Sequence, residues 1–193
     1  MNRLESALAD AARDLDALGA RWAVVGGLAV SARAEPRLTR DVDIAVSVTD
    51  DSDAERLIAD LGARGYVPVT LVEQTATSRL ATVRLRRRGS PILVDLLFSS
   101  SGIEPELVAD AERIAVTDTL ALPVARRPHL IALKVLSRND RDRPQDLDDL
   151  RALLAGASEV DIEQARAALA LIESRGFHRG RALVDAFNAL LPP

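Results

Sequence analysis

Two aspartates alternate with branched apolar residues in the segment DVDIAVSV, residues 41–48, and this alternation strongly limits the folds open to the chain. The valine and isoleucine content predicts a β-strand. Because strand side chains alternate between two faces, Asp41 and Asp43 would share one face, about 6–7 Å apart. Two like charges at partial burial repel by roughly a few kcal/mol. The sheet must therefore either expose this face to water along an edge strand or place a cation between the carboxylates.

A pair of glycines stands before this strand. The apolar run WAVV, residues 22–25, leads into Gly26 and Gly27, and LAVSARA follows with a helical pattern. The combination predicts a strand that turns tightly into a helix, where free backbone N–H groups can hold a phosphate. Glycine lacks the Cβ that would keep the phosphate away. The turn therefore predicts a site for an anionic ligand.

A third acid, Asp95, stands in the apolar segment PILVDLLF, residues 91–98. This segment predicts a central strand, where an unpaired carboxylate is costly. Carboxylates, together with phosphate oxygens of a substrate, are ligands that Mg²⁺ prefers. Three acids on neighbouring strands beside a phosphate-binding turn predict a site for one or two Mg²⁺ or Mn²⁺ ions that transfers phosphoryl or nucleotidyl groups.

The remaining pattern divides the chain into two parts. Apolar spacings of three and four predict a helix over residues 2–18, and Ser52 with Glu55 has the spacing of a capping box that opens another. Further strands are expected at 66–72, 80–88 and 91–98, and further helices at 128–138, at 144–156, after a capping box of Asp161 with Gln164, and near 181–191. We therefore expect an α+β fold, in which a mixed sheet flanked by helices over residues 1–125 carries a packed helical part, residues 126–193.

Composition excludes several classes of protein. The absence of cysteine excludes disulfides, thiolate zinc sites and cysteine nucleophiles. A net charge of −4 argues against a protein that coats nucleic acid without specificity. No apolar stretch approaches the roughly 18 residues of a membrane span, and the N-terminus lacks an apolar signal segment. We therefore expect a cytoplasmic protein without membrane contact.

Lys134 is the only lysine of the chain, in which all other cationic side chains are arginines. It lies in a segment, PHLIALKVLSR, that is apolar almost all round and predicts a buried helix. Its side chain either extends to the surface or reaches into a cleft, where it would neutralise phosphate charge. Asp146 either orients this lysine or takes part in the chemistry, or it only stabilises the start of a helix that begins near Pro144.

Arginine gathers at two places in the sequence. The clusters comprise Arg84, Arg86, Arg87 and Arg88, and then Arg126, Arg127, Arg138, Arg141 and Arg143. Each cluster is either a solvated face or a set of contacts to the phosphates of RNA.

These motifs together resemble a known family. The glycine pair, the T-R-D-x-D stretch and the later single aspartate resemble the DNA polymerase β-like nucleotidyltransferase superfamily. Within it, GGLAV…RLTRDVDI combined with IALKVLSR…RPQDLDDL is similar to the AbiEii/AbiGii group of toxin nucleotidyltransferases, which includes the MenT toxins. The resemblance covers roughly residues 20–155, and it implies a polymerase β-like core.

The resemblance also implies roles for individual residues. Asp41, Asp43 and Asp95 match the metal-binding carboxylates, and Gly26 with Gly27 matches the turn that contacts the triphosphate. The catalytic lysine of the family falls on Lys134, and its later acid falls on Asp146, with Asp149 as the alternative. Thr39 would lie beside the nucleotide. A kinase-like antitoxin would block the site by phosphorylating its hydroxyl, or the hydroxyl only forms a local hydrogen bond.

The function that the resemblance implies is metal-dependent transfer from a nucleoside triphosphate to the 3′ end of tRNA. Transfer of CMP from CTP is one example, and it would block translation. The protein would then be the toxin of a type IV-like toxin-antitoxin system and would have a cognate antitoxin. Two alternatives stay open. The chain could instead modify a small molecule, as aminoglycoside nucleotidyltransferases do, or be an inactive nucleotide-binding partner.

Overall fold

The computed structural model describes residues 3–75, 77–117, 120–139 and 145–191. In this part of the chain, seven strands form one mixed sheet in the order β3-β4-β5-β2-β1-β7-β6. The strands are β1 (Arg21–Val25), β2 (Val42–Ser47), β3 (Tyr66–Glu73), β4 (Leu80–Arg87), β5 (Leu93–Leu97), β6 (Glu112–Thr117) and β7 (Leu120–Val124). The helices are α1 (Arg3–Ala17), α2 (Gly26–Arg33), α3 (Asp51–Ala63), α4 (Glu104–Ala109), α5 (Arg127–Ser137), α6 (Gln145–Ala155), α7 (Glu159–Ser174) and α8 (Leu183–Asn188). The predicted α+β class is confirmed.

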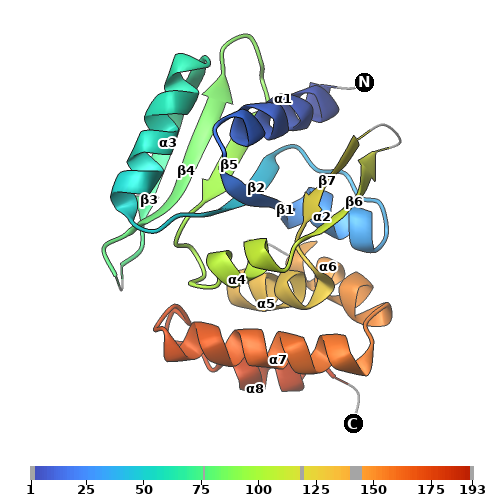
Figure 1. The fold of residues 1–193 in the computed structure, drawn as a ribbon. Coiled ribbons are helices and arrows are strands. Elements are labelled where there is room, and N and C mark those ends of the chain that lie inside the picture. Colours follow the sequence, from blue (N-terminus) through green and yellow to red (C-terminus); the bar gives the residue numbers. More distant parts are fainter. Residues whose placement is uncertain (1–2, 76, 118–119, 140–144, 192–193) are drawn as a thin grey trace.

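The helices lie in two groups (Figure 1). Helices α1 and α3 lie over one face of the sheet, whereas α5 to α8 form a layer below it. Apolar residues on neighbouring strands, such as Val24, Ile44 and Leu96, lie in register and are fully buried at the centre of the core. No helix in the described ranges combines the length and the apolar character needed to cross a lipid bilayer.

Strand β2 occupies the middle of the sheet. It pairs antiparallel with β1 on one side and parallel with β5 on the other. The two aspartates are therefore not on an edge strand, and the edge-strand interpretation of the sequence is wrong. Strand β2 begins at Val42, so Asp41 lies just before it, and Asp43 lies within it.

The predicted start of α3 was misplaced by two residues. Asp50 is the N-cap residue, and its carboxylate accepts the backbone N–H of Asp53 at 3.0 Å. Ser52 with Glu55 therefore forms no capping box. Four capping-type residues in succession, DDSD, leave the first turn ambiguous, because each can accept a backbone N–H.

Helix α7 also begins earlier than predicted. Ser158 accepts the backbone N–H of Asp161, and the carboxylate of Asp161 accepts the backbone N–H of Ser158, so these two residues form the capping box. Asp161 with Gln164 is therefore not the box. Two further features were not predicted from the sequence: helix α4, and the hairpin of β6 and β7, which extends the sheet beyond β1.

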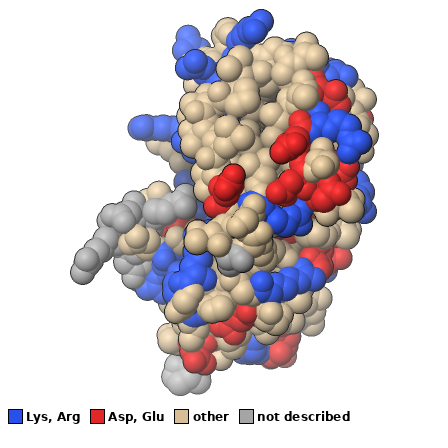
Figure 2. Space-filling view, turned by 90° about the vertical axis from the view of Figure 1, so that its left-hand side faces the viewer, with Lys and Arg blue, Asp and Glu red and all other residues tan. Residues whose placement is uncertain are grey.

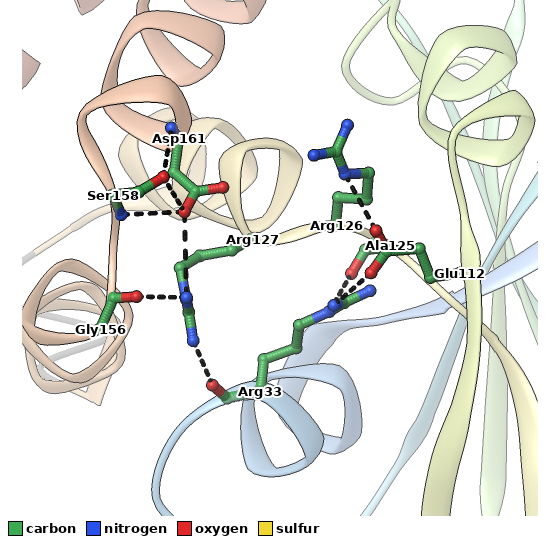
Figure 3. A network of polar contacts seen from close by, with 8 residues as sticks. All are labelled: Arg33, Glu112, Ala125, Arg126, Arg127, Gly156, Ser158 and Asp161. Atoms are coloured by element: carbon green, nitrogen blue, oxygen red, sulfur yellow. Dashed lines mark hydrogen bonds and ion pairs between the residues drawn. The ribbon is translucent and has the colours of Figure 1, made fainter.

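A polar network ties the helical layer to the sheet (Figure 3). The Arg127 guanidinium, at the start of α5, donates to the backbone oxygen of Gly156 and, at 2.8 Å, to that of Arg33 at the end of α2. It also lies 3.9 Å from the carboxylate of Asp161. Arg33 donates to the backbone of β7 and forms an ion pair of 2.7 Å with Glu112 of β6. This network fixes α2 against α5, and both helices border the site described next.

Basic and acidic side chains lie next to one another on the face of the molecule shown in Figure 2. Several arginines of the two sequence clusters stabilise the fold through such contacts. Arg126 forms an ion pair of 3.3 Å with Glu112, and Arg127 belongs to the network above. Arg87 points toward α1, where it pairs with Asp10, and its guanidinium lies over the ring of Tyr66. Residues Arg141, Arg143 and Pro144 lie outside the described residues.

Candidate active site

A row of side chains crosses the sheet at one level. Arg84 of β4 pairs in register with Asp95 of β5, Asp95 with Asp43 of β2, and Asp43 with Val25 of β1. Residues in register on neighbouring strands point to the same face, and adjacent strands are about 4.8 Å apart. The sheet therefore brings two carboxylates and one guanidinium together on the face opposite to Arg87.

Gly26 makes room for the carboxylate of Asp43. Its backbone has φ +62°, and a Cβ placed there would lie 2.0 Å from Oδ2 of Asp43. Any larger residue would have to displace the acid and would also be strained. A Cβ on Gly27 would lie 2.6 Å from the Arg37 guanidinium and 2.8 Å from Oγ1 of Thr39. The glycine pair thus allows the turn to approach both the acid and the loop before β2.

These residues line a cleft of about 500 Å³ between the sheet and the helical layer. One wall carries Gly26, Gly27, Thr39, Asp41, Asp43, Arg84 and Asp95, and the other carries Lys134, Ser137 and Asp146. The cleft therefore gathers, in one place, all eight residues that the sequence analysis assigned to the site.

Asp95 forms a bidentate ion pair with Arg84. Nε and one terminal nitrogen of the guanidinium donate to the two carboxylate oxygens at 2.8 Å and 2.7 Å. This hydrogen bonding raises the pKa of Arg84 further above its ordinary value, and the charges of Asp95, Asp41 and Asp43 raise it as well. The guanidinium thus lies in the field of all three acids.

Lys134 is held by two buried acids on the opposite wall. Its Nζ lies 2.7 Å from Oδ1 of Asp146 and 2.7 Å from Oδ2 of Asp149. Asp146 also accepts a hydrogen bond of 3.0 Å from the hydroxyl of Ser137, and Asp149 forms an ion pair of 2.7 Å with Arg37. Both alternatives for the lysine partner are therefore present, because one helical turn of α6 presents both acids to the same ammonium group.

The ion pairs of Arg84 and Arg37 with acids of this site were not predicted from the sequence. Arg84 was assigned only to a general basic cluster. The signal that would have found it is the hairpin of β4 and β5, which sets Arg84 opposite Asp95. A hairpin register that differs by one residue would place Arg84 on the other face.

Comparison with known proteins identifies the family. The family described as "Nucleotidyl transferase AbiEii toxin, Type IV TA system" matches residues 7–191. The chain belongs to the AbiEii family. It is a nucleotidyltransferase, it binds nucleoside triphosphates, and its family implies a partner antitoxin. The predicted family is thus confirmed over a longer part of the chain than the motifs span. No protein with a curated description matches the chain significantly.

Solved structures share the fold of this AbiEii protein. An antigenic nucleotidyltransferase-like protein from Paracoccidioides brasiliensis aligns with a TM-score of 0.56 and 19% identity, over 99% of this chain and 94% of that one. The structure of ANT(2″)-Ia in complex with adenylyl-2″-tobramycin aligns with a TM-score of 0.59 and 14% identity, over 88% of this chain and 97% of that one. At such identities the likeness shows a common fold.

The acids of the cleft suit a divalent cation. Asp41, Asp43 and Asp95 are hard oxygen ligands of the kind that Mg²⁺ and Mn²⁺ bind, and all three border the same cleft. Within the described residues, no three acidic or histidine side chains are grouped closely enough to hold a metal ion in this conformation. The carboxylate of Asp95 is engaged by Arg84. The chemistry of these three donors therefore fits a divalent ion.

Proposed function

We propose that this AbiEii protein transfers a nucleotide from a nucleoside triphosphate to the 3′ end of tRNA in a reaction that needs Mg²⁺ or Mn²⁺. The observation that carries the proposal is the register of Asp43 with Asp95, on a face that lies across a cleft from Lys134. Carboxylates on one wall and an ammonium group on the other can hold the two ends of a metal-bound triphosphate.

The residues divide the work between positioning and charge neutralisation. A divalent ion bound by Asp41, Asp43 and Asp95 would supply the positive charge that bridges the triphosphate and activates the acceptor hydroxyl. Gly26 and Gly27, at the start of α2, line the same cleft, and the free backbone N–H groups of a helix start suit the phosphates. Attack of the hydroxyl on the α-phosphate then releases pyrophosphate.

Lys134 neutralises negative charge from the opposite wall. Its two ion pairs with Asp146 and Asp149 fix its position, so the ammonium group would meet the triphosphate without rearrangement. Of the two acids, Asp146 lines the cleft and Asp149 does not. We assign Asp146 the role of orienting the lysine.

The charge of the cleft favours an anionic acceptor. The described residues that line it include five basic side chains, Arg37, Arg40, Arg84, Lys134 and Arg179, and four aspartates, Asp41, Asp43, Asp95 and Asp146. Arg37, Arg84 and Lys134 are paired with acids, and the five cations exceed the four aspartates by one positive charge, which favours the phosphates of an RNA end over a polycationic aminoglycoside. This composition supports tRNA over the small-molecule alternative.

The experiment is incubation of the purified protein with total RNA, Mg²⁺ and each labelled nucleoside triphosphate in turn. Asp41→Ala serves as the control. Label in tRNA supports the proposal, and label from CTP alone would support CMP transfer. Label that enters only an added aminoglycoside would select the small-molecule alternative. Absence of all transfer would favour an inactive nucleotide-binding protein.

Thr39 is a proposed site of regulation by a kinase-like antitoxin. Its side chain lines the cleft, and its hydroxyl donates at 3.5 Å to the backbone oxygen of Asp41. A phosphate there would add roughly two negative charges beside the carboxylates and oppose triphosphate binding. Mass spectrometry of the protein after co-expression with its antitoxin tests this. An unmodified Thr39 in a neutralised toxin would exclude the mechanism.

A further inference from the structure

We infer that Arg84 is a displaceable counter-ion of the metal site. It neutralises Asp95 while the divalent ion is absent, and it releases Asp95 when the ion binds. The inference rests on the proposed metal-dependent function and adds to it a residue that sets metal affinity. The three suitable carboxylates border one cleft, although within the described residues they are not grouped closely enough to hold a metal ion in this conformation.

The guanidinium and a divalent ion would compete for Asp95. Arg84 uses two of its N–H groups to reach both oxygens of the carboxylate, at 2.8 Å and 2.7 Å. A metal ligand must direct one of these oxygens to the ion, and the ion would then lie beside a cation that it repels. Binding of an ion by Asp95 therefore favours movement of Arg84 away from the carboxylate.

The two partners differ in their freedom to move. The side chain of Asp95 is 12% exposed and short, and it stands on a strand in the interior of the sheet. The side chain of Arg84 is 40% exposed and long, and it lines the open cleft. The side chain of Arg84 can therefore adopt another rotamer that extends into the cleft, whereas Asp95 stays in place and binds the ion.

The contrast with Lys134 supports the assignment. The ammonium group of Lys134 is paired with Asp146 and Asp149, whose side chains are only 1% and 2% exposed. Release of that lysine would remove the ammonium group from two buried acids and leave Asp149 with the charge of Arg37 alone, which is unfavourable. Release of Arg84 leaves Asp95 with the incoming divalent ion as its new partner. Once released, the guanidinium stays in the cleft, where it can pair with a phosphate of the nucleotide.

The test measures metal affinity without turnover. Mn²⁺ binding to the nucleotide-free protein is followed by electron paramagnetic resonance for the wild type, Arg84→Gln and Arg86→Gln. Arg86 is the matched control, because it is an exposed arginine on the same strand and the same face, two residues away. We expect Arg84→Gln to bind Mn²⁺ about tenfold more tightly, since the ion no longer competes with a guanidinium for the Asp95 carboxylate and is no longer repelled by its charge. Arg86→Gln should change the affinity less than about twofold.

Two further variants keep the result interpretable. Arg84→Lys retains the charge without the bidentate contact, so its gain in affinity should be smaller than that of Arg84→Gln. Adding Asp95→Asn to Arg84→Gln should remove the gain, because the released carboxylate is then missing. Circular dichroism confirms that each variant is folded. If Arg84→Gln binds Mn²⁺ no more tightly than the wild type, or if the gain survives Asp95→Asn, the inference is overturned.

The outcomes also separate this inference from the proposed function. Transfer to RNA that requires Mn²⁺ or Mg²⁺ in the wild type, with unchanged Mn²⁺ affinity in Arg84→Gln, would leave the function intact and remove the role of Arg84. If the wild type transfers nucleotides fully in the presence of a chelator, the metal-dependent function fails first, and the inference fails with it.

Discussion

The two walls of the cleft treat their charges in opposite ways. On the helical wall, Lys134 meets Asp146 and Asp149, and all three side chains are nearly inaccessible to solvent. On the sheet wall, Asp41 and Asp43 are partly exposed, and Arg84, which pairs with Asp95, is more exposed still. One wall has a fixed internal ion network, and the other has acids whose counter-ion can be exchanged.

The difference follows from the elements that carry the charges. Helix α6 presents both acids to α5 across a helix-helix contact, where removing either partner leaves a buried charge. The sheet presents Asp43 and Asp95 in register on the face that borders the cleft, where a ligand in the cleft can reach them. A buried network suits a group that must hold one position, and an open row suits ligands that must accept an ion.

Asp43→Asn should cause the largest loss. Removing a central carboxylate should lower the rate of nucleotidyl transfer by about 10³-fold, because the metal-bound triphosphate loses a ligand at the reacting centre. Transfer from labelled nucleoside triphosphate measures it, with Asp60→Asn on the exposed side of α3 as the control. A variant that keeps more than a tenth of the activity would show that the sheet wall does not bind the ion.

Lys134→Ala should be the most destabilising of the single changes. It removes the ammonium group from the buried Asp146 and leaves Asp149 paired only with Arg37, and breaking a buried ion pair in this way typically costs about 3–5 kcal/mol. Arg84→Ala, on the more exposed wall, should lower the free energy of unfolding by no more than about 1 kcal/mol. Urea unfolding of both variants compares the walls directly. Equal losses of unfolding free energy in the two variants would contradict the distinction between a fixed helical wall and an exchangeable sheet wall.

Gly26→Ala should cost about 1–3 kcal/mol through backbone strain and should also impair transfer. Its Cβ would displace the Asp43 carboxylate, whereas the Cβ of Gly19→Ala meets nothing within 4 Å at a similar φ of +67°. Thermal unfolding and transfer are measured for both. The Gly19→Ala control should lose stability but keep its transfer activity. If the two variants keep the same transfer activity, the close approach of Gly26 to the Asp43 carboxylate does not affect catalysis.

The smallest effect concerns His129, on the same helix as Lys134. Burial lowers the pKa of this imidazole, Arg126 lowers it further, and Asp110 partly offsets both. The folded state therefore resists protonation. Stability should be highest above the unfolded pKa of about 6.5 and should fall by up to about 1 kcal/mol as the pH drops from 7 to 5.5.

His129→Gln should flatten this part of the pH profile of unfolding. The carboxyls with lowered pKa, Asp10, Glu106 and Asp161, lose their contributions only at lower pH, below about 4.5. An unchanged slope between pH 7 and 5.5 in the variant would show that the imidazole is protonated equally in both states.

The sequence predicted the acids better than their partners. The alternation of Asp41 and Asp43 in a β-branched run, and one acid in an apolar strand, were enough to place Asp43 and Asp95 on the sheet and Asp41 just before it. The pairing of Arg84 with Asp95 depends on the hairpin register, which the Gly89-Ser90-Pro91 turn does not fix to a single residue. The helix starts failed for a similar reason, because adjacent polar residues compete for the same cap.

The close approach of position 26 to the carboxylate of residue 43 couples two sites in evolution. While the acid is retained, selection holds position 26 to glycine for its lack of a side chain as well as for its backbone conformation. A lineage that lost the acid would lose the first of these constraints. Among homologues, the residue at position 26 should therefore report whether the catalytic chemistry has been kept.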